Sequence, residues 1–238
     1  MKIKGIATII LLFTLSLGYS QSTTEFFSKA DTFFGKYVQS GRVDYKSIKN
    51  NPALLNELVD MAKNISVSKD KASEYQAFWI NGYNISVIKT VVDNYPLSSP
   101  LKKAGFFDGI KQEIGGKKIT LNDIENKLLR GNFKSEPRFH FVLVCAGLGC
   151  PPIINKAYKP STLEAQLEKQ TKIALNNPKF IRVNKNKVQV SQIFEWYKGD
   201  FTKNGKLAAY IDGYRNEKFP AKVKLSYYPY DWTLNDKK

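Results

Sequence analysis

A long run of aromatic and branched residues at helical spacing constrains the fold of this 238-residue chain more than any other feature. The run begins after Asp70, which we expect to cap a helix, and it ends at Pro96, which cannot continue one. Its regular positions lie four residues apart and are Tyr75, Trp79, Tyr83, Val87, Val91 and Tyr95. Because residues four apart lie on one face of a helix, the pattern predicts a central helix with a continuous apolar face.

The first half of the chain is predicted to be mainly helical around that element. Segments 25–38 and 52–63 carry apolar side chains at helical spacing. These side chains are Phe26, Phe27, Phe33, Phe34 and Tyr37 in the first segment, and Leu54, Leu55, Leu58 and Met61 in the second. A hairpin is expected at Gly115-Gly116, and Thr120 with Asp123 predicts the start of a further helix.

The second half is predicted to supply most of the strands. Segment 138–145 is apolar on both faces apart from His140, a composition typical of a strand inside a sheet. Ser161 and Glu164 form a capping box that is expected to open a helix over residues 163–175. Later strands are expected at 180–183, 188–190 and 223–227. Helices first and strands later predict an α+β fold, in which the central helix packs on a mainly antiparallel sheet.

Residues 1–20 are predicted to be a cleavable signal peptide. Two lysines precede an apolar stretch over residues 6–17, and Gly18 and Ser20 occupy positions where signal peptidase needs small side chains. The apolar stretch is shorter than the ~20 residues that cross a bilayer as a helix. We therefore expect an exported protein, periplasmic or extracellular, in which residues 21–238 form a single domain without a transmembrane segment.

The basic composition bears on the partners of the chain. The formal net charge of +16 becomes +14 without Lys2 and Lys4, and such a charge favours anionic partners. The basic residues are scattered, however, and the only adjacent pairs are Lys102-Lys103, Lys117-Lys118 and Lys237-Lys238. A localised nucleic-acid footprint is therefore absent from the sequence. We expect no nucleic-acid partner, and a peptide, a glycan or an anionic envelope surface remain as candidates.

Both cysteines lie in one short segment, at positions 145 and 150, with two glycines between them. In an oxidising exported compartment such a pair is most often a structural disulfide. In the alternative interpretation one cysteine is a nucleophile and His140 is its base. On a regular strand His140 and Cys145 would point to opposite faces, because side chains alternate. Cys150 is therefore the better partner for His140.

A zinc site is a third interpretation of the same residues. Two cysteines and His140 would supply three ligands, with water in the fourth position. The spacing is not a common ligand pattern, and the chain has no second histidine. We therefore expect neither a metal nor a cofactor.

His140 is the only histidine of the chain, so any imidazole base in this protein must be this residue. A polar residue in an apolar strand needs a hydrogen-bond partner, whether its role is structural or catalytic. Glu74 and Asn81 are seven residues apart, so they lie on one face of the central helix and interrupt its apolar surface. We expect His140, Glu74 and Asn81 to share one partly enclosed pocket. An open pocket with Cys150 at its rim would favour the enzyme, and a sealed one a structural role.

Three segments that follow one another along the chain carry rare combinations of aromatic and polar residues. They are residues 77–84 (AFWINGYN), residues 138–145 (RFHFVLVC) with Cys150-Pro151-Pro152, and residues 230–235 (YDWTLN), and they are supported by residues 43–45, 123–125, 191–197 and Asp200-Phe201. Together they resemble the domain-of-unknown-function family 547 (DUF547), a resemblance that implies no established activity. Gly82 departs from the family, which more usually has alanine there, and glycine costs a helix up to about 1 kcal/mol.

A helix with polar groups that packs on a strand bearing a histidine is similar in outline to papain-like and transglutaminase-like folds. In those enzymes the helix carries the cysteine, whereas no cysteine stands between Ser73 and Tyr95 here. The resemblance therefore implies an outline and not a standard catalytic dyad.

Two function classes remain open at this point. The first is an envelope hydrolase or acyl transferase that uses His140 with Cys150 or with water, while Glu74 or Asn81 orients the reacting group. The second is a non-catalytic exported module that binds a peptide, glycan or lipid surface. Its contacts would be aromatic residues such as Trp196, Tyr197, Tyr228, Tyr230 and Trp232.

Overall fold

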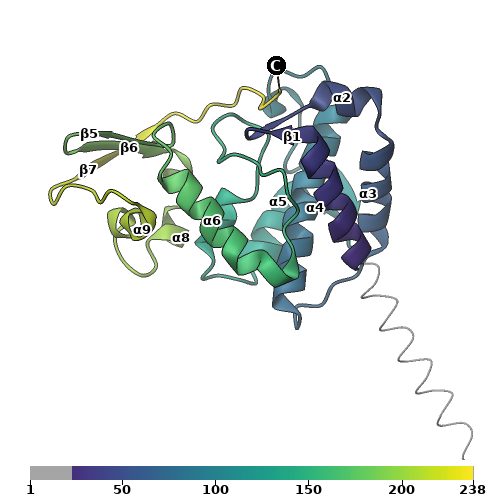
Figure 1. Cartoon of the computed structure of the whole chain (residues 1–238), viewed down its shortest axis with the longest axis horizontal. Coiled ribbons are helices and arrows are strands. Elements are labelled where there is room, and N and C mark those ends of the chain that lie inside the picture. The colour runs from purple at the N-terminus through teal and green to yellow at the C-terminus, as the bar shows by residue number, and fades with distance from the viewer. Residues whose placement is uncertain (1–22, 238) are drawn as a thin grey trace, which may run out of the picture.

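The computed structural model describes residues 23–237, so the predicted signal peptide lies outside the described residues. The fold is α+β, as predicted, with helices through the first half and strands concentrated later (Figure 1). Within residues 23–237 no helix has both the length and the apolar composition needed to cross a membrane.

Helix α4, Ala72–Asp93, is the predicted central helix. It is buried on nearly every side, which is why its apolar residues extend beyond the four-residue pattern of the sequence. Lys71 and not Asp70 occupies the N-cap position, so the predicted cap was wrong by one residue. Asn94 follows the last turn, two residues before Pro96.

The N-terminal helices cover one side of α4. They are the helix over residues 23–37, α2 (Tyr45–Asn50) and α3 (Ala53–Asn64), and the short strands β1 (Val38–Gln39) and β2 (Arg42–Val43) connect the first two. The carboxylate of Asp44 caps α2, accepting a hydrogen bond from the backbone N–H of Ser47 at 2.9 Å. In Figure 1 these helices lie on the side of the molecule opposite to strands β5 to β7.

The predicted hairpin around Gly115-Gly116 is confirmed as antiparallel strands β3 (Lys111–Ile114) and β4 (Lys117–Thr120). A Cβ atom on Gly115 would lie 2.6 Å from the Trp79 ring, so glycine is required for the hairpin to approach α4. A Cβ atom on Gly82 would lie 2.3 Å from the Ile114 Cδ1 atom. Glycine at position 82 thus makes room for this hairpin.

The predicted helix after Thr120 is also confirmed. The Thr120 hydroxyl accepts a hydrogen bond from the N–H of Asp123 and caps the short α5 (Leu121–Asp123). The helix continues as a π-helix, η2 (Ile124–Arg130). Such π-helical segments occur frequently at functional sites.

The predicted strand over residues 138–145 was wrong. Residues Pro137–Phe141 form a 3-10 helix, η3, and the residues after it are irregular. Pro137 suits the first turn of a helix, and the Glu136 carboxylate caps it by accepting from the N–H of Arg138. The segment is buried, as its apolar composition predicts, but its backbone is held by the side chain of Asn84 and not by a neighbouring strand.

Helix α6 (Leu163–Leu175) spans the predicted residues, but the predicted capping box was wrong. Ser161 belongs to a short 3-10 helix, η4 (Pro160–Thr162), and no side chain caps α6. Glu164 instead accepts two hydrogen bonds from Arg138, at 2.5 and 2.9 Å. The carboxylate is therefore engaged by a guanidinium from another segment.

The remaining strands form a separate three-stranded sheet. Strands β5 (Ile181–Asn184) and β6 (Lys187–Ser191) form the predicted hairpin, and β7 (Lys224–Tyr228) pairs with β6 in parallel. The strands of the described chain thus make small separate sheets, mostly antiparallel, and not one sheet under α4. The papain-like or transglutaminase-like outline is not confirmed. Short helices lie beside this sheet: α7 (Ile193–Trp196), α8 (Lys198–Phe201) and α9 (Leu207–Tyr214).

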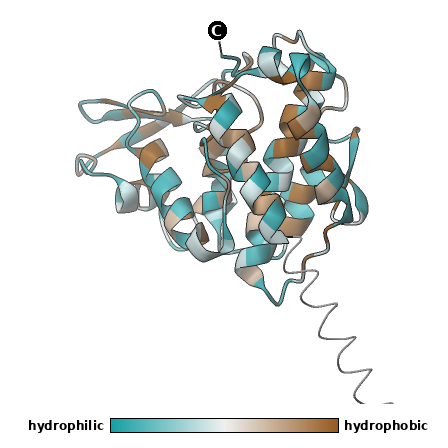
Figure 2. Ribbon diagram, turned by 45° about the vertical axis from the view of Figure 1, so that its right-hand side comes forward, coloured by the Kyte–Doolittle hydropathy of each residue, from teal (hydrophilic) through white to brown (hydrophobic). Residues whose placement is uncertain are grey.

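Two hydrophobic clusters result from this arrangement. One surrounds α4, and the other joins the β5–β7 sheet to α7, α8 and α9. Figure 2 shows brown, hydrophobic residues along the packed helices and teal, hydrophilic residues along many of the peripheral loops. Cys150 packs against both clusters, which places the segment 145–150 at their junction.

Candidate functional site

A pocket of about 310 Å³ opens at the junction of the two clusters. It contains His140 and both cysteines, together with aromatic and polar side chains from α4, η2, α7 and the C-terminal segment. The other lining residues are Tyr83, Phe107, Asn122, Glu125, Leu143, Ile193, Trp196, Tyr197, Tyr230 and Trp232. A mostly apolar pocket with a few convergent polar groups is the usual form of a small-molecule site. We call it the thiol pocket.

Asn84 positions the backbone that carries two of these residues. Its amide nitrogen donates to the carbonyl of Val142 at 2.9 Å, and its amide oxygen accepts from the N–H of Val144 at 2.9 Å. The side chain is buried, so these hydrogen bonds replace the partners that a strand would have supplied. Helix α4 thereby holds the segment between His140 and Cys145 against the pocket.

His140 is held by a carboxylate from α8. Its Nε2 atom lies 2.8 Å from an Asp200 carboxylate oxygen, and its ring stacks on Tyr197 with 4.0 Å between the ring centroids. Arg130 donates from Nε to the same Asp200 oxygen at 2.7 Å. The hydrogen bond from His140, followed by that from Arg130, holds the pKa of Asp200 well below its usual range despite partial burial. Asp200 is therefore ionised, and it orients the imidazole.

The cysteine loop is built against the C-terminal segment. The N–H of Leu148 donates to the carbonyl of Thr233, and the N–H of Gly149 donates to the carbonyl of Asp231, both at 2.8 Å. A Cβ atom on Gly149 would lie 2.8 Å from the Tyr230 ring and 2.9 Å from the Asp231 nitrogen. Glycine at this position therefore allows the loop to lie directly on Tyr230.

The two thiols and one phenol form a compact triangle. The sulfur atoms of Cys145 and Cys150 lie 2.7 Å apart, and the Tyr230 hydroxyl lies 2.7 Å from each of them. The backbone N–H of Cys145 also donates to the Cys150 sulfur, at 3.0 Å. The Cys150 sulfur thus has a thiol, a hydroxyl and a donating backbone amide within hydrogen-bonding distance.

This arrangement separates the pKa values of the two thiols. Burial raises the pKa of Cys150, but hydrogen bonds from Cys145, Tyr230 and the backbone outweigh burial and leave it below its ordinary value. The hydrogen bond to Cys150, and then burial, raise the pKa of Cys145 well above its ordinary value. Of the two thiols, Cys150 is therefore the one that loses its proton more readily.

Both cysteines are free thiols in this structure. Their sulfur separation of 2.7 Å exceeds the roughly 2.05 Å of a disulfide bond. The predicted disulfide is therefore not formed here, although the loop folds back as its glycines suggested. The expectation that His140 and Cys145 point apart was wrong, because it assumed a regular strand, and both line the thiol pocket.

The structure does not bring Glu74 and Asn81 to His140. Neither residue lines the thiol pocket. Asn81 is fully buried, donates to the carbonyls of Ala77 and Tyr158, and accepts from the N–H of Tyr158. Glu74 lies 3.5 Å from the hydroxyl of Thr23. Asn81 thus supports the chain before α6, and the expected constellation of these residues with His140 was wrong.

The sequence interpretation missed the residues that do surround His140 and Cys150. Asp200 and Tyr230 contact them, and Glu125 and Asn122 line the same pocket. Asp200, Tyr230 and Glu125 each lie in a segment that carries the family resemblance. Their position in those segments was the available sequence signal for a functional role. It did not indicate which of these residues contact His140 or Cys150.

Aromatic rings form part of the wall of the thiol pocket. Trp196 and Trp232 are stacked at 6.0 Å, and Trp232 also lies 4.6 Å from the ring of Tyr230 and 6.0 Å from that of Phe107. Trp196 is 45% exposed, a large fraction for a tryptophan. These rings border the opening of the pocket and offer apolar faces to a ligand.

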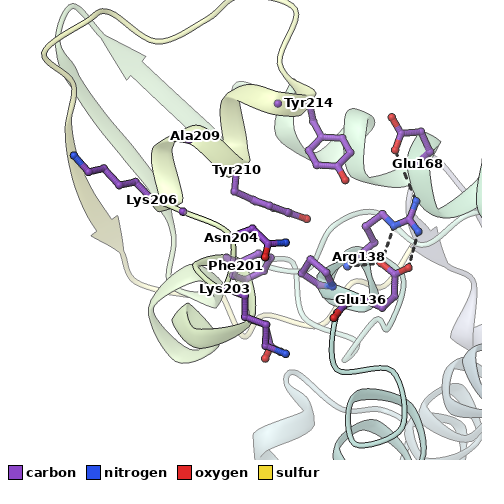
Figure 3. Close-up of a pocket in the computed structure, with 15 residues that line it drawn as sticks. Glu136, Arg138, Glu168, Phe201, Lys203, Asn204, Lys206, Ala209, Tyr210 and Tyr214 are labelled. Atoms are coloured by element: carbon purple, nitrogen blue, oxygen red, sulfur yellow. Dashed lines mark hydrogen bonds and ion pairs between the residues drawn. The ribbon is translucent and has the colours of Figure 1, made fainter.

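A larger pocket of about 650 Å³ lies beyond Asp200, between α8, α9 and η3 (Figure 3). Arg138 is its main cation and is paired with Glu136 and Glu164. Figure 3 shows the aromatic side chains of Tyr210 and Tyr214 beside this ion-pair cluster. The described residues that line this larger pocket include no cysteine or histidine. The thiol pocket is therefore the better candidate for chemistry.

The zinc interpretation gains no support from the described part of the chain. Residues 23–237 contain no group of three or more His, Cys, Asp or Glu side chains arranged to hold a metal ion. The single imidazole is occupied at Nε2 by Asp200.

Comparison with known proteins gives one match. Residues 67–173 match the family model described as "Protein of unknown function, DUF547". This range includes α4, η3 and both cysteines, whereas Asp200 and Tyr230 lie after it. No curated protein and no solved structure matches the chain.

Proposed function

Because residues 67–173 belong to the DUF547 family, whose function is unknown, we propose from the thiol pocket itself that the protein is an acyl-transferring enzyme, a hydrolase or an acyl transferase, with Cys150 as its nucleophile. The observation that carries the proposal is the set of three donors on the Cys150 sulfur in a pocket that also contains His140. We also propose that the enzyme is exported, on the strength of the predicted signal peptide.

The donors give Cys150 the properties of an activated nucleophile. A thiolate is the reactive form of cysteine, and its fraction rises as the pKa of the thiol falls. Cys145 and Tyr230 have raised pKa values and so remain protonated donors at neutral pH. The two neighbours therefore stabilise the anion on Cys150 without competing for its charge.

His140 is the proposed general acid and base. When its Nε2–H donates to Asp200, the neutral imidazole keeps a lone pair on Nδ1. The stacking on Tyr197 and the ion pair of Asp200 with Arg130 limit rotation of the ring. A nucleophile and a base that a third group orients are the standard components of thiol-dependent acyl transfer.

The proposed reaction proceeds in two balanced steps. The Cys150 thiol gives its proton to His140, and the sulfur bonds to the acyl carbon of an ester or amide. The bond to the leaving group breaks, and the leaving group takes the proton from His140, which leaves a thioester on Cys150. Water or another nucleophile then attacks the thioester and gives its proton to His140, the carbon–sulfur bond breaks, and the acyl group leaves on that nucleophile. His140 returns the proton to the Cys150 sulfur.

A disulfide between Cys145 and Cys150 is the proposed oxidised state of the same site. The sulfur atoms are already in contact, so oxidation by an external disulfide or a peroxide would require little movement of the chain. Such a bond would block the nucleophile. The proposed acyl-transfer activity therefore requires that both cysteines are reduced.

Acyl-enzyme trapping tests the proposal directly. Reduced protein is mixed with p-nitrophenyl acetate, quenched in acid and analysed by intact mass and peptide mapping. We expect one acetyl group on Cys150. Cys145→Ser is the matched control, because it removes the neighbouring sulfur and leaves the proposed nucleophile, whereas Cys150→Ser should lose the adduct.

The outcomes separate the two function classes. His140→Gln with intact folding should slow acetylation and deacylation if His140 is the base. No acetylation of Cys150 in reduced, folded protein would refute the enzyme proposal. Saturable binding of a peptide or glycan under that condition would favour the non-catalytic module instead.

A further inference from the structure

We propose that the thiol pocket binds a primary ammonium group, held by Glu125 and the faces of Trp196 and Trp232, and that this amine is the acyl acceptor. The inference deepens the proposed function and rests on it. It assigns a substrate class, a primary amine such as a lysine side chain, to the second half-reaction.

Glu125 is the first observation. It lies in the π-helix η2 and lines the thiol pocket beside Tyr197, whose pKa is raised by burial and then by Glu125. Among the described residues no lysine, arginine or histidine is paired with it. Its acidic neighbours differ, because Asp123 is paired with Lys127 and Asp200 with Arg130.

Glu125 is the one carboxylate among the described residues that line the thiol pocket. The formal net charge is +16, so basic side chains are in excess over acidic ones. Partial burial strengthens the attraction between a carboxylate and a cation, because the local dielectric constant is lower than in water. The carboxylate of Glu125 is therefore available to a ligand cation in the pocket.

The aromatic wall is the second, independent observation. Trp196 and Trp232 stack at 6.0 Å and line the pocket together with Phe107 and Tyr83. Tryptophan faces attract cations more strongly than other aromatic side chains, and aromatic cages are a recurrent way to hold ammonium groups. One face of Tyr197 is already covered by His140, so that face is not available to the ligand.

The second half-reaction then follows with balanced atoms. The bound ammonium releases one proton to solvent through Glu125, and the neutral nitrogen attacks the thioester carbon on Cys150. The carbon–sulfur bond breaks and a second proton passes from nitrogen to His140. The products are an N-substituted amide and the Cys150 thiolate.

Binding of n-butylammonium chloride, compared with 1-butanol at equal ionic strength, tests the site without activity. Tryptophan fluorescence and ligand-observed NMR follow the titration in reduced, full-length mature protein. We expect saturable binding of the cation, with 1-butanol at least about tenfold weaker because it lacks the charge-assisted contact. Glu125→Gln should abolish this preference, and Trp232→Leu should weaken binding of the cation.

Glu195→Gln is the matched control, because it removes the same charge from an exposed residue next to Trp196 that does not line the pocket. It should bind n-butylammonium as the wild type does. Equal affinity for 1-butanol and n-butylammonium, or a Glu125→Gln variant with unchanged preference, would overturn the inference.

A second readout separates this inference from the proposed function. With p-nitrophenyl acetate as donor, n-butylamine should yield N-butylacetamide in the wild type, while Glu125→Gln should lose this product and keep the acetylated Cys150. Acetylation without ammonium binding would refute the inference alone. Ammonium binding without acetylation would refute the acyl-transfer proposal and the acceptor role of the amine, while the ammonium site itself would stand.

Discussion

Removing the Asn84 side chain should destabilise the protein strongly, since this residue links α4 to the segment that carries His140 and Cys145. Asn84→Ala deletes two hydrogen bonds of 2.9 Å and leaves the carbonyl of Val142 and the N–H of Val144 without partners. Each unsatisfied buried group costs about 1–3 kcal/mol, so the loss of unfolding free energy should be about 2–6 kcal/mol.

Thermal unfolding by circular dichroism measures this loss. A domain of this size loses about 2–4 °C in Tm per kcal/mol, so the midpoint should fall by roughly 5–20 °C. Asn64→Ala is the matched control, because that exposed asparagine makes a single hydrogen bond to the carbonyl of Asp60 in its own helix. Its unfolding free energy should change by no more than about 0.5 kcal/mol.

The same variant tests the link between fold and site. Loss of the backbone support should disorder the thiol triangle, so alkylation of the two cysteines should become similar in rate below the Tm. A change of less than about 1 kcal/mol in Asn84→Ala, with thiol selectivity retained, would refute the idea that these hydrogen bonds hold the segment.

Further expectations concern the loop, the ion pair and the nucleophile. Gly149→Ala should cost about 1–3 kcal/mol because its Cβ atom would meet Tyr230, whereas Gly199→Ala, with open space around it, should be neutral or stabilising in urea unfolding. Asp200 has a lowered folded-state pKa, so its ionic stabilisation is present above the unfolded pKa of about 3.9 and is lost as pH falls toward the lower folded value. The stability difference between wild type and Asp200→Asn should therefore be largest near neutral pH and shrink in acid; a constant difference contradicts this. Iodoacetamide should label Cys150 before Cys145 at neutral pH, and Tyr230→Phe should slow the labelling of Cys150 by removing a donor; faster labelling of Cys145 would reverse the assignment.

Several elements were predictable from the sequence because their signals are local. Helix α4, the hairpin at Gly115-Gly116 and the Thr120 cap all depend on residues within a few positions of one another. The α+β class follows from the order of these elements along the chain. Local periodicity and capping were sufficient for these features.

The error over residues 138–145 has a clear physical reason. An apolar run predicts burial but does not identify the partner of its backbone. Here that partner is the side chain of Asn84, 58 residues before Val142, and not a neighbouring strand. The capping box at Ser161 failed similarly, because Arg138 engages Glu164 from 26 residues away.

The sequence identified His140 and Cys150 as the groups able to do chemistry, because the chain has one histidine and two cysteines. It did not identify Asp200 or Tyr230 as their partners, since these lie 60 and 80 residues away along the chain. Only the tertiary structure decided which carboxylate meets the imidazole and which cysteine has the lower pKa. Composition and local spacing limit which residue types are present, whereas hydrogen-bond partners and pKa shifts depend on distances that only the folded chain sets.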